Sequence, residues 1–182
     1  ASPRQAVSMP AGCEKVAFDA VVEPGKTSTL LDKKGPGAIR EFVVKTKAGD
    51  LVQALRHAVV RMSFDGEQTV ESPLGNFFGA APGINAYESL PLGVTQDGEM
   101  WCHWVMPFAR SAKIEVVNMG GEAATVAGSV SVDMTSSAWT KRSMHFHAKW
   151  RGESAVKTRP MIDWNYVMAT GQGVFAGVAF TI

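Results

Sequence analysis

Apolar and polar residues alternate along most of the chain, which is typical of β-strands with one face in the core. Glycine and proline clusters, for example at residues 24–25 and 35–37, separate one alternating run from the next. Strands are expected at residues 16–22, 28–31, 38–46, 59–64, 67–72, 100–106, 112–118, 124–135, 144–150, 164–169 and 173–182. About ten strands without a clear helix predict an all-β, antiparallel sandwich.

Residues 50–58 are the one segment where a helix competes with a strand. Leu51, Leu55 and Ala58 have helical spacing, but the segment runs without a break into the strand expected at 59–64. We interpret the whole stretch as one long strand.

The most informative stretch runs from residue 59 to residue 79, VVRMSFDGEQTVESPLGNFFG. Asp65-Gly66 is a strong turn dipeptide between two β-prone runs, and Pro73 ends the second run. Glycines then bracket Asn76 and an aromatic pair. Residues 79–92 follow as a loop rich in Gly, Pro and Asn, and a loop of this length suggests function or subunit contact.

A chain of 182 residues is long enough for one domain with a real core. We therefore expect an irregular arm at residues 1–15 and a single domain at 16–182. The formal charge of +1, with Lys and Arg scattered, argues against nucleic-acid partners. No apolar run approaches the roughly 20 residues that span a bilayer, so no membrane partner is expected.

The two ends of the chain suggest its origin. The start lacks the apolar core of a signal peptide, although a leader could already have been removed, and a secreted or periplasmic location is favoured. An apolar strand that reaches Ile182 suggests that the natural protein continues.

Cys13 and Cys102 have no spacing signature, and free cysteine is commonly a small buried residue, so we expect them to be unpaired. No CxxC motif occurs, and neither a metal nor another cofactor is expected. His145 and His147 would share one face of a strand, as two metal ligands do in cupin-like enzymes. A polar layer or an interface explains this pair better, and His57 and His103 are interpreted as structural.

Carboxylates and tryptophans are the remaining candidates for chemistry. Asp65, Glu67 and Glu71 surround the hairpin turn, and paired carboxylates hydrolyse glycosides. Turn geometry alone explains Asp-Gly, so we favour the structural interpretation. The five tryptophans would suit either carbohydrate stacking or a core. They are Trp101, Trp104, Trp139, Trp150 and Trp164.

Several motifs together resemble the family known as domain of unknown function 2961, part of which is classed as glycoside hydrolase family 172. They are FDGE at residues 64–67, ESPLGNFFG at 71–79, GPGAI at 35–39, MPF at 106–108, HAKWR at 147–151, Asp163-Trp164, and GQGVFAG at 171–177. They span residues 35–177 in the family's order.

The resemblance implies a jelly-roll fold like one half of a double-jelly-roll, viral-capsid-like subunit, commonly assembled as trimers. It also implies a retaining, two-glutamate activity on furanosides such as difructose anhydrides and D-arabinofuranosyl linkages. The family's Trp-Gly-Glu-Gly-Asp and Gly-Thr-Glu-Asp-Tyr stretches, which hold both glutamates, do not occur in this sequence. Asn76 also stands where the family usually has Asp.

We therefore assign no catalytic residue, and expect the isolated chain to be inactive and the glutamates to lie in a second jelly-roll half. The residues that we expect to contact a furanoside are Asp65, Glu67, Asn76, Trp101, His103 and Trp164. The alternative is a non-catalytic carbohydrate-binding or oligomeric assembly module. A homo-oligomer, in particular a trimer, is the expected assembly.

Overall fold

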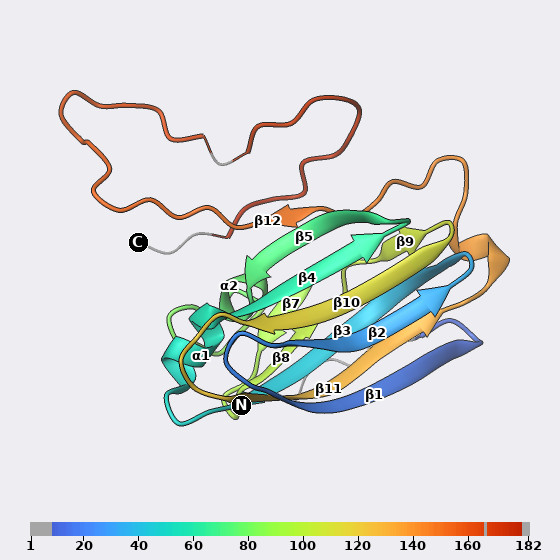
Figure 1. Cartoon of the computed structure of the whole chain (residues 1–182). Coiled ribbons are helices and arrows are strands. Elements are labelled where there is room, and N and C mark those ends of the chain that lie inside the picture. Colours follow the sequence, from blue (N-terminus) through green and yellow to red (C-terminus); the bar gives the residue numbers. More distant parts are fainter. Residues whose placement is uncertain (1–8, 166, 180–182) are drawn as a thin grey trace.

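The computed structural model describes residues 9–165 and 167–179, which form two β-sheets packed face to face (Figure 1). Sheet A contains, in spatial order, β1 (Cys13–Val22), β11 (Ala124–Asp133), β3 (Gly37–Lys47), β8 (Glu99–Cys102), β7 (Leu92–Val94) and β6 (Tyr87–Glu88), with β9 (Met106–Phe108) also paired to β3. Sheet B contains β12 (Ala148–Lys149), β5 (Glu67–Pro73), β4 (Ala58–Phe64), β10 (Ser111–Asn118) and β2 (Thr27–Lys34). All pairs are antiparallel except β12 with β5.

The strand order is that of a jelly roll. The first strand, β1, pairs with the last long strand, β11, and β11 pairs with β3, which pairs with β8. In sheet B the corresponding order is β5, β4, β10, β2. Each sheet thus interleaves strands from distant parts of the chain, as two Greek keys do. The all-β, antiparallel jelly-roll sandwich expected from the sequence is confirmed.

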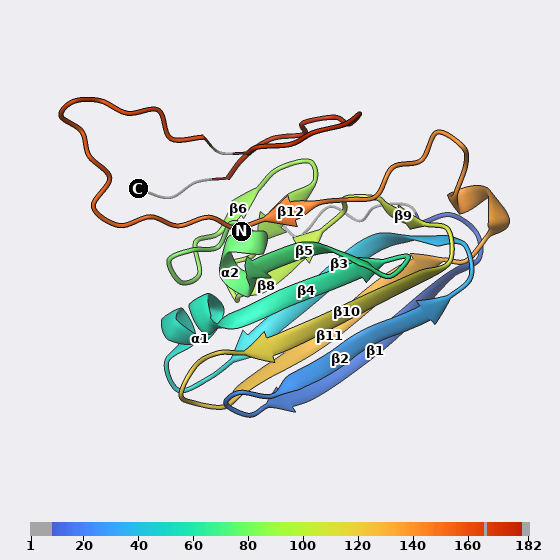
Figure 2. The same ribbon diagram turned by 45° about the horizontal axis from the view of Figure 1, so that its top comes forward.

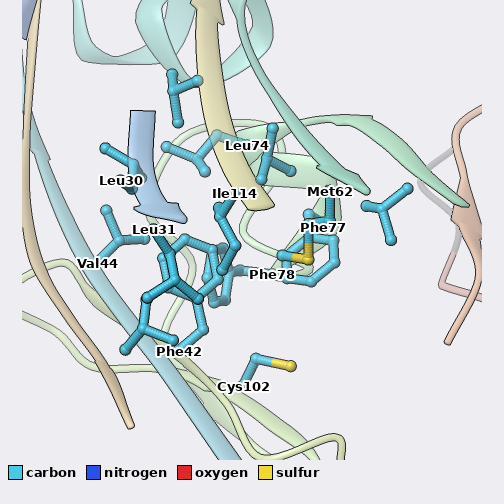
Figure 3. Close-up of a cluster of buried hydrophobic side chains, with 14 of the residues drawn as sticks. Leu30, Leu31, Phe42, Val44, Met62, Leu74, Phe77, Phe78, Cys102 and Ile114 are labelled. Carbon is cyan, nitrogen blue, oxygen red and sulfur yellow. The ribbon is translucent and has the colours of Figure 1, made fainter. Parts of the chain in front are cut away.

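The core lies between the sheets and is rich in aromatic and long aliphatic side chains (Figure 3). Strand β10 shows the period of two directly, because its residues alternate between half-buried and buried over its whole length. Phe42 on β3 is fully buried, and its ring centroid lies 6.1 Å from that of Phe18 and 5.3 Å from that of Phe78. These contacts bring β1, β3 and the region after β5 into one core.

The hairpin of β4 and β5 is confirmed, with Phe64 opposite Glu67 across the turn. Asp65 and Gly66 have φ values of 56° and 95°, the left-handed conformation that this tight turn requires. Strand β5 ends at Pro73, and the short helix α2 (Leu74–Phe77) follows. Leu74, Phe77 and Phe78 are buried, so the aromatic pair is part of the core.

The long strand expected over residues 50–64 is wrong in its first half, where the structure has the helix α1 (Leu51–His57). The Asp50 side chain accepts a hydrogen bond from the Gln53 backbone N–H at 3.0 Å and so caps the helix. Leu55 is buried against the core, while Arg56 and His57 lie in the last turn, where the helix dipole favours positive charge. The Asp50 cap and the helical spacing of the apolar residues therefore determine the conformation of this segment, and the strand begins only at Ala58.

The strand expected at residues 100–106 is interrupted. The chain leaves the sheet after β8 and re-enters it at β9, and residues 103–105 lie between these strands. The His103 backbone N–H donates to the Pro91 carbonyl at 2.7 Å, which continues the register of β7 and β8 by one residue before the chain turns away. This break affects the candidate site below.

The strands expected at residues 144–150, 164–169 and 173–182 are wrong for the residues that the structure describes, except at Ala148–Lys149. The 3-10 helix η1 (Ser136–Ala138) follows β11, and the short β12 then pairs with β5. Beyond β12 the chain leaves the sandwich, as both views show (Figure 2). Among the described residues after β12, none belongs to a strand of sheet A or sheet B. Residues 166 and 180–182 of the expected strands lie outside the described part.

The loop at residues 79–92 contains β6 and is held by side chains. The Tyr87 hydroxyl donates to the Phe78 carbonyl at 2.6 Å, and the Asn85 amide donates to the Ala80 and Pro82 carbonyls. Both cysteines are free, as expected, and burial raises the pKa of the Cys102 thiol to about 12. In the described part of the chain, no helix has the length and apolar character needed to cross a membrane.

We expect Phe42→Ala to lower the free energy of unfolding by about 3–5 kcal/mol, because it opens a cavity among aromatic rings of the core. Urea denaturation followed by fluorescence would measure the loss. Val21→Ala, at a side chain that is 62% exposed, is the matched control and should change stability by less than about 0.5 kcal/mol. Equal effects of the two substitutions would contradict this description of the core.

Candidate functional site

Asp65 lies at the hairpin turn, where its carboxylate is saturated with hydrogen bonds. Its oxygens accept from the backbone N–H groups of Ala109, Arg110 and Ser111 at 3.0, 2.6 and 2.9 Å. Burial raises the pKa of Asp65, but these three bonds and one from His145 outweigh burial and lower it to about 2. Such a carboxylate is ionised at neutral pH and fixes the loop before β10, and it is poorly suited to act as a general acid.

His145 connects the segment after β11 to this turn. Its Nε2 lies 2.9 Å from Asp65 Oδ2, and its ring lies 5.1 Å from the ring of Trp139. His147 is exposed, and no strand places the two imidazoles side by side. Among the described residues no group of three potential ligands could hold a metal ion.

The other expected site residues are widely separated. Glu67 is exposed at the start of β5, whereas Asn76 is half-buried in α2, beyond the far end of the same strand. Seven residues of extended chain separate these ends by roughly 20 Å. Trp164 lies in the segment after β12, where its indole N–H donates to Glu153 at 2.6 Å. The structure therefore does not bring Asp65, Glu67, Asn76 and Trp164 into one site.

Trp101 and His103 are the pair that the structure does bring together. Their rings are stacked with centroids 4.5 Å apart. Trp101 is only 4% exposed, and its ring lies across Gly93 of β7, where an added Cβ would come within 2.3 Å of the ring. Trp101 therefore has no exposed ring face on which a sugar could stack, and it packs against the His103 ring instead.

A buried carboxylate holds the other side of His103. The Nε2 atom of His103 lies 3.2 Å from Glu41 Oε1, and the Ser131 hydroxyl donates to Glu41 Oε2 at 3.2 Å. Both the imidazole and the carboxylate are largely buried, with side-chain exposures of 8% and 5%. A carboxylate on one ring nitrogen fixes the orientation of the imidazole, as in other His–carboxylate pairs.

An open hollow of about 440 Å³ lies over His103. It is lined by Leu90, Pro91, His103, Trp104 and Val105. Leu90 is 95% exposed and Val105 is 47% exposed, so the hollow is open to solvent at these residues. The interruption between β8 and β9 creates it, because residues 103–105 leave the sheet and carry the Trp104 ring with them.

Trp104 is anchored by packing. It packs against the core, and its ring centroid lies 6.2 Å from that of Phe146 in the segment before β12. The hollow thus combines an aromatic wall, a positioned imidazole and aliphatic residues on its rim. This combination suits a ligand with one apolar face and several hydroxyl groups.

A second hollow, of about 280 Å³, lies beside α1 at the opposite end of the hairpin from Asp65, with Asp50, His57 and Glu122 among its lining residues. Two of its polar side chains already form hydrogen bonds within the domain. Asp50 caps α1, and the Asn118 amide donates to the Val22 and Glu122 carbonyls. No Trp, Tyr or Phe lines it, so we favour the hollow at Trp104.

Sequence reasoning identified His103 but missed Trp104, Leu90 and Pro91 as neighbours of one site. The available signal was Met106-Pro107, since proline disfavours a central strand position and so weakens the case for a continuous strand over 100–106. The stacking of Trp101 under His103 depends on Gly93 in another strand, which no local pattern reveals.

The fold and this hollow define a jelly-roll β-domain with an aromatic-walled surface site. A family model described as GH172 domain-like matches residues 12–132, more than half of the chain, and the chain belongs to this family. Membership relates the domain to the glycoside hydrolases. No curated protein matches the chain.

One solved structure with similarity is titled "Structure of infectious bursal disease virus Gx strain". Its sequence is 17% identical, the TM-score is 0.30, and the match covers 66% of this chain. The chain spans 30% of the length of that viral chain.

Asp65 should make stability depend on acid pH. Its pKa lies near 2 in the folded chain against an ordinary value of 3.8, so its stabilisation is present above about pH 4 and is lost as the pH falls toward 2. We expect Asp65→Asn to lower the free energy of unfolding at neutral pH by about 1–3 kcal/mol and to flatten this dependence. Urea denaturation between pH 6 and pH 2 would measure both effects.

Glu67→Gln is the matched control, because it removes an exposed carboxylate beside the same turn and should leave the acid dependence unchanged. An Asp65→Asn variant with the stability and pH dependence of the natural chain would show that the four hydrogen bonds contribute little.

Proposed function

We propose that this domain belongs to a glycoside hydrolase that acts on furanosides of the difructose anhydride or D-arabinofuranoside type, and that the hollow at Trp104 holds part of the sugar. The observation that carries the proposal is the GH172-like match over residues 12–132, which includes the whole hollow. The substrate class follows from the family resemblance of the motifs.

The chemistry of the hollow supports a sugar ligand. A flat indole face stacks on the C–H face of a sugar ring, and an imidazole held by Glu41 can hydrogen-bond to a hydroxyl. The volume of about 440 Å³ lies within the usual range of small-molecule sites, roughly 300–1,000 Å³.

We further propose that the two catalytic glutamates come from a second jelly-roll half of the protein. Retaining glycosidases need two carboxyl groups about 5–5.5 Å apart, one of them with a raised pKa. Asp65 has the opposite shift, Glu71 pairs with Arg61 at 2.9 Å, and Glu41 is buried with His103. These carboxylates support the fold, which suits a domain that contributes scaffold and binding.

A non-catalytic carbohydrate-binding module is the second candidate. The absence of an exposed carboxylate among the residues that line the hollow favours it. The two candidates differ in whether a longer natural product hydrolyses what this domain binds.

Binding is tested first on the chain itself. We expect an arabinofuranosyl or difructose anhydride oligosaccharide to bind, and Trp104→Leu to weaken binding at least about tenfold because it removes the flat ring while keeping the position apolar. Isothermal titration calorimetry would measure the affinity. Trp150→Leu, at a tryptophan outside the hollow, is the control, and equal losses in both variants would contradict a site at Trp104.

Hydrolysis then separates the two candidates. The intact mass of the natural gene product shows whether it is longer than this chain, and both proteins are incubated with the same furanosides. We expect release of sugar by a longer product only. Hydrolysis by the 182-residue chain would refute the proposal that the catalytic glutamates lie in a second half. Binding without hydrolysis by the longer product would favour the binding module.

A further inference from the structure

Residues 139–147, here called the strap, join the end of η1 to the start of β12. They belong to no helix or strand, and Figures 1 and 2 show them within the orange segment that leads to β12. Both ends of the strap are held, because Ala138 before it is buried and Ala148 after it pairs with Val70 of β5. The strap therefore connects the last long strand of sheet A to the edge of sheet B.

His145 attaches the strap to the hairpin turn. Its Nε2 lies 2.9 Å from Asp65 Oδ2, and its side chain is 22% exposed. The His145 ring also stacks on Phe64, with centroids 6.3 Å apart and an interplanar angle of 18°, and it lies 5.1 Å from the ring of Trp139. These contacts fix the imidazole on three sides and hold the strap backbone at this residue.

Phe146, the next residue of the strap, packs against Trp104. Their ring centroids lie 6.2 Å apart, and both side chains pack against the core. Trp104 lies between β8 and β9 and belongs to neither strand, so its ring depends on side-chain packing for its position. Adjacent residues are only about 3.8 Å apart along the chain, so a strap that is fixed at His145 also holds Phe146 against Trp104.

The carboxylate of Asp65 also holds the chain on the other side of β9. It accepts from the backbone N–H groups of residues 109–111, which follow β9, whereas Trp104 precedes β9. One side chain at the hairpin turn thus constrains the chain after β9 directly and the chain before β9 through the strap. Asp65 does not line the hollow, and this route connects it to the hollow nevertheless.

We propose that the strap positions Trp104, and that His145 and Phe146 are positioning residues for the sugar site in the hollow. The part of this inference that concerns sugar rests on the proposed function. Neither residue lines the hollow, so both act through the indole ring. The ring can stack on a sugar only when its flat face is held toward the hollow, and this orientation is what the strap supplies.

Fluorine NMR of the chain labelled with fluorotryptophan tests the strap without any sugar. The chain has five tryptophans, and the Trp104→Leu variant identifies the Trp104 signal by its loss. We expect His145→Leu and Phe146→Leu each to shift or broaden this signal, because the ring loses its support. His147→Leu is the matched control, since His147 is an exposed histidine of the same strap and should leave the signal unchanged.

Urea denaturation shows which variants are folded, and Phe146→Leu alone decides the outcome if His145→Leu does not fold. A Trp104 signal that is unchanged in the folded variants, or that His147→Leu shifts as much as they do, would overturn the proposal.

Sugar affinity measures the consequence for the site, with the same arabinofuranosyl or difructose anhydride oligosaccharide as the probe. We expect His145→Leu and Phe146→Leu each to weaken binding by about threefold to tenfold. Because both residues act by one route, His145→Leu should add little further loss to a chain that already carries Phe146→Leu. Additive losses, or an unchanged affinity despite a shifted Trp104 signal, would overturn the positioning role. A natural chain that binds no furanoside would refute the proposed function instead, and the fluorine signal would still decide whether the strap positions Trp104.

Discussion

A β-strand persists only where a neighbouring strand accepts and donates its backbone hydrogen bonds, and this constraint determines the architecture of the chain. Strand β3 illustrates it, because β11 covers one side while β8 and β9 share the other. The exposed run after β12 illustrates the converse. Its side chains favour a strand, yet it has no strand partner among the described residues. Pairing, rather than propensity, separates the sandwich from the segment outside it.

Local sequence patterns predicted much of the fold. The β-prone run at residues 38–46, the Asp65-Gly66 turn and the proline that ends β5 each act within a few residues, and each predicted its element correctly. The alternation at 38–46 was misleading about burial, because β3 is buried on both faces. The segment at 50–58 was misread although Asp50 provided a capping signal. The strands expected after residue 143 failed for a different reason, since their existence depends on a partner that no local pattern specifies.

The candidate site was less predictable because it depends on contacts between distant segments. Trp101 and Trp104 are three residues apart, yet Gly93 accommodates the first ring in the sheet and the break before β9 brings the second to the hollow. Their different burial could not be read from residue type. Asp65 was likewise expected to contact a furanoside, but the backbone N–H groups of residues 109–111 already occupy its carboxylate.

The pairing of β1 with β11 also affects how the domain is made. Cys13 lies opposite Asp133, so the first strand cannot complete its ladder until more than a hundred further residues have been synthesised. Such long-range pairing gives a high contact order and slow folding, during which the edge of β3 that β11 will occupy is unprotected. We therefore expect the nascent domain to expose this strand edge until its last long strand has left the ribosome.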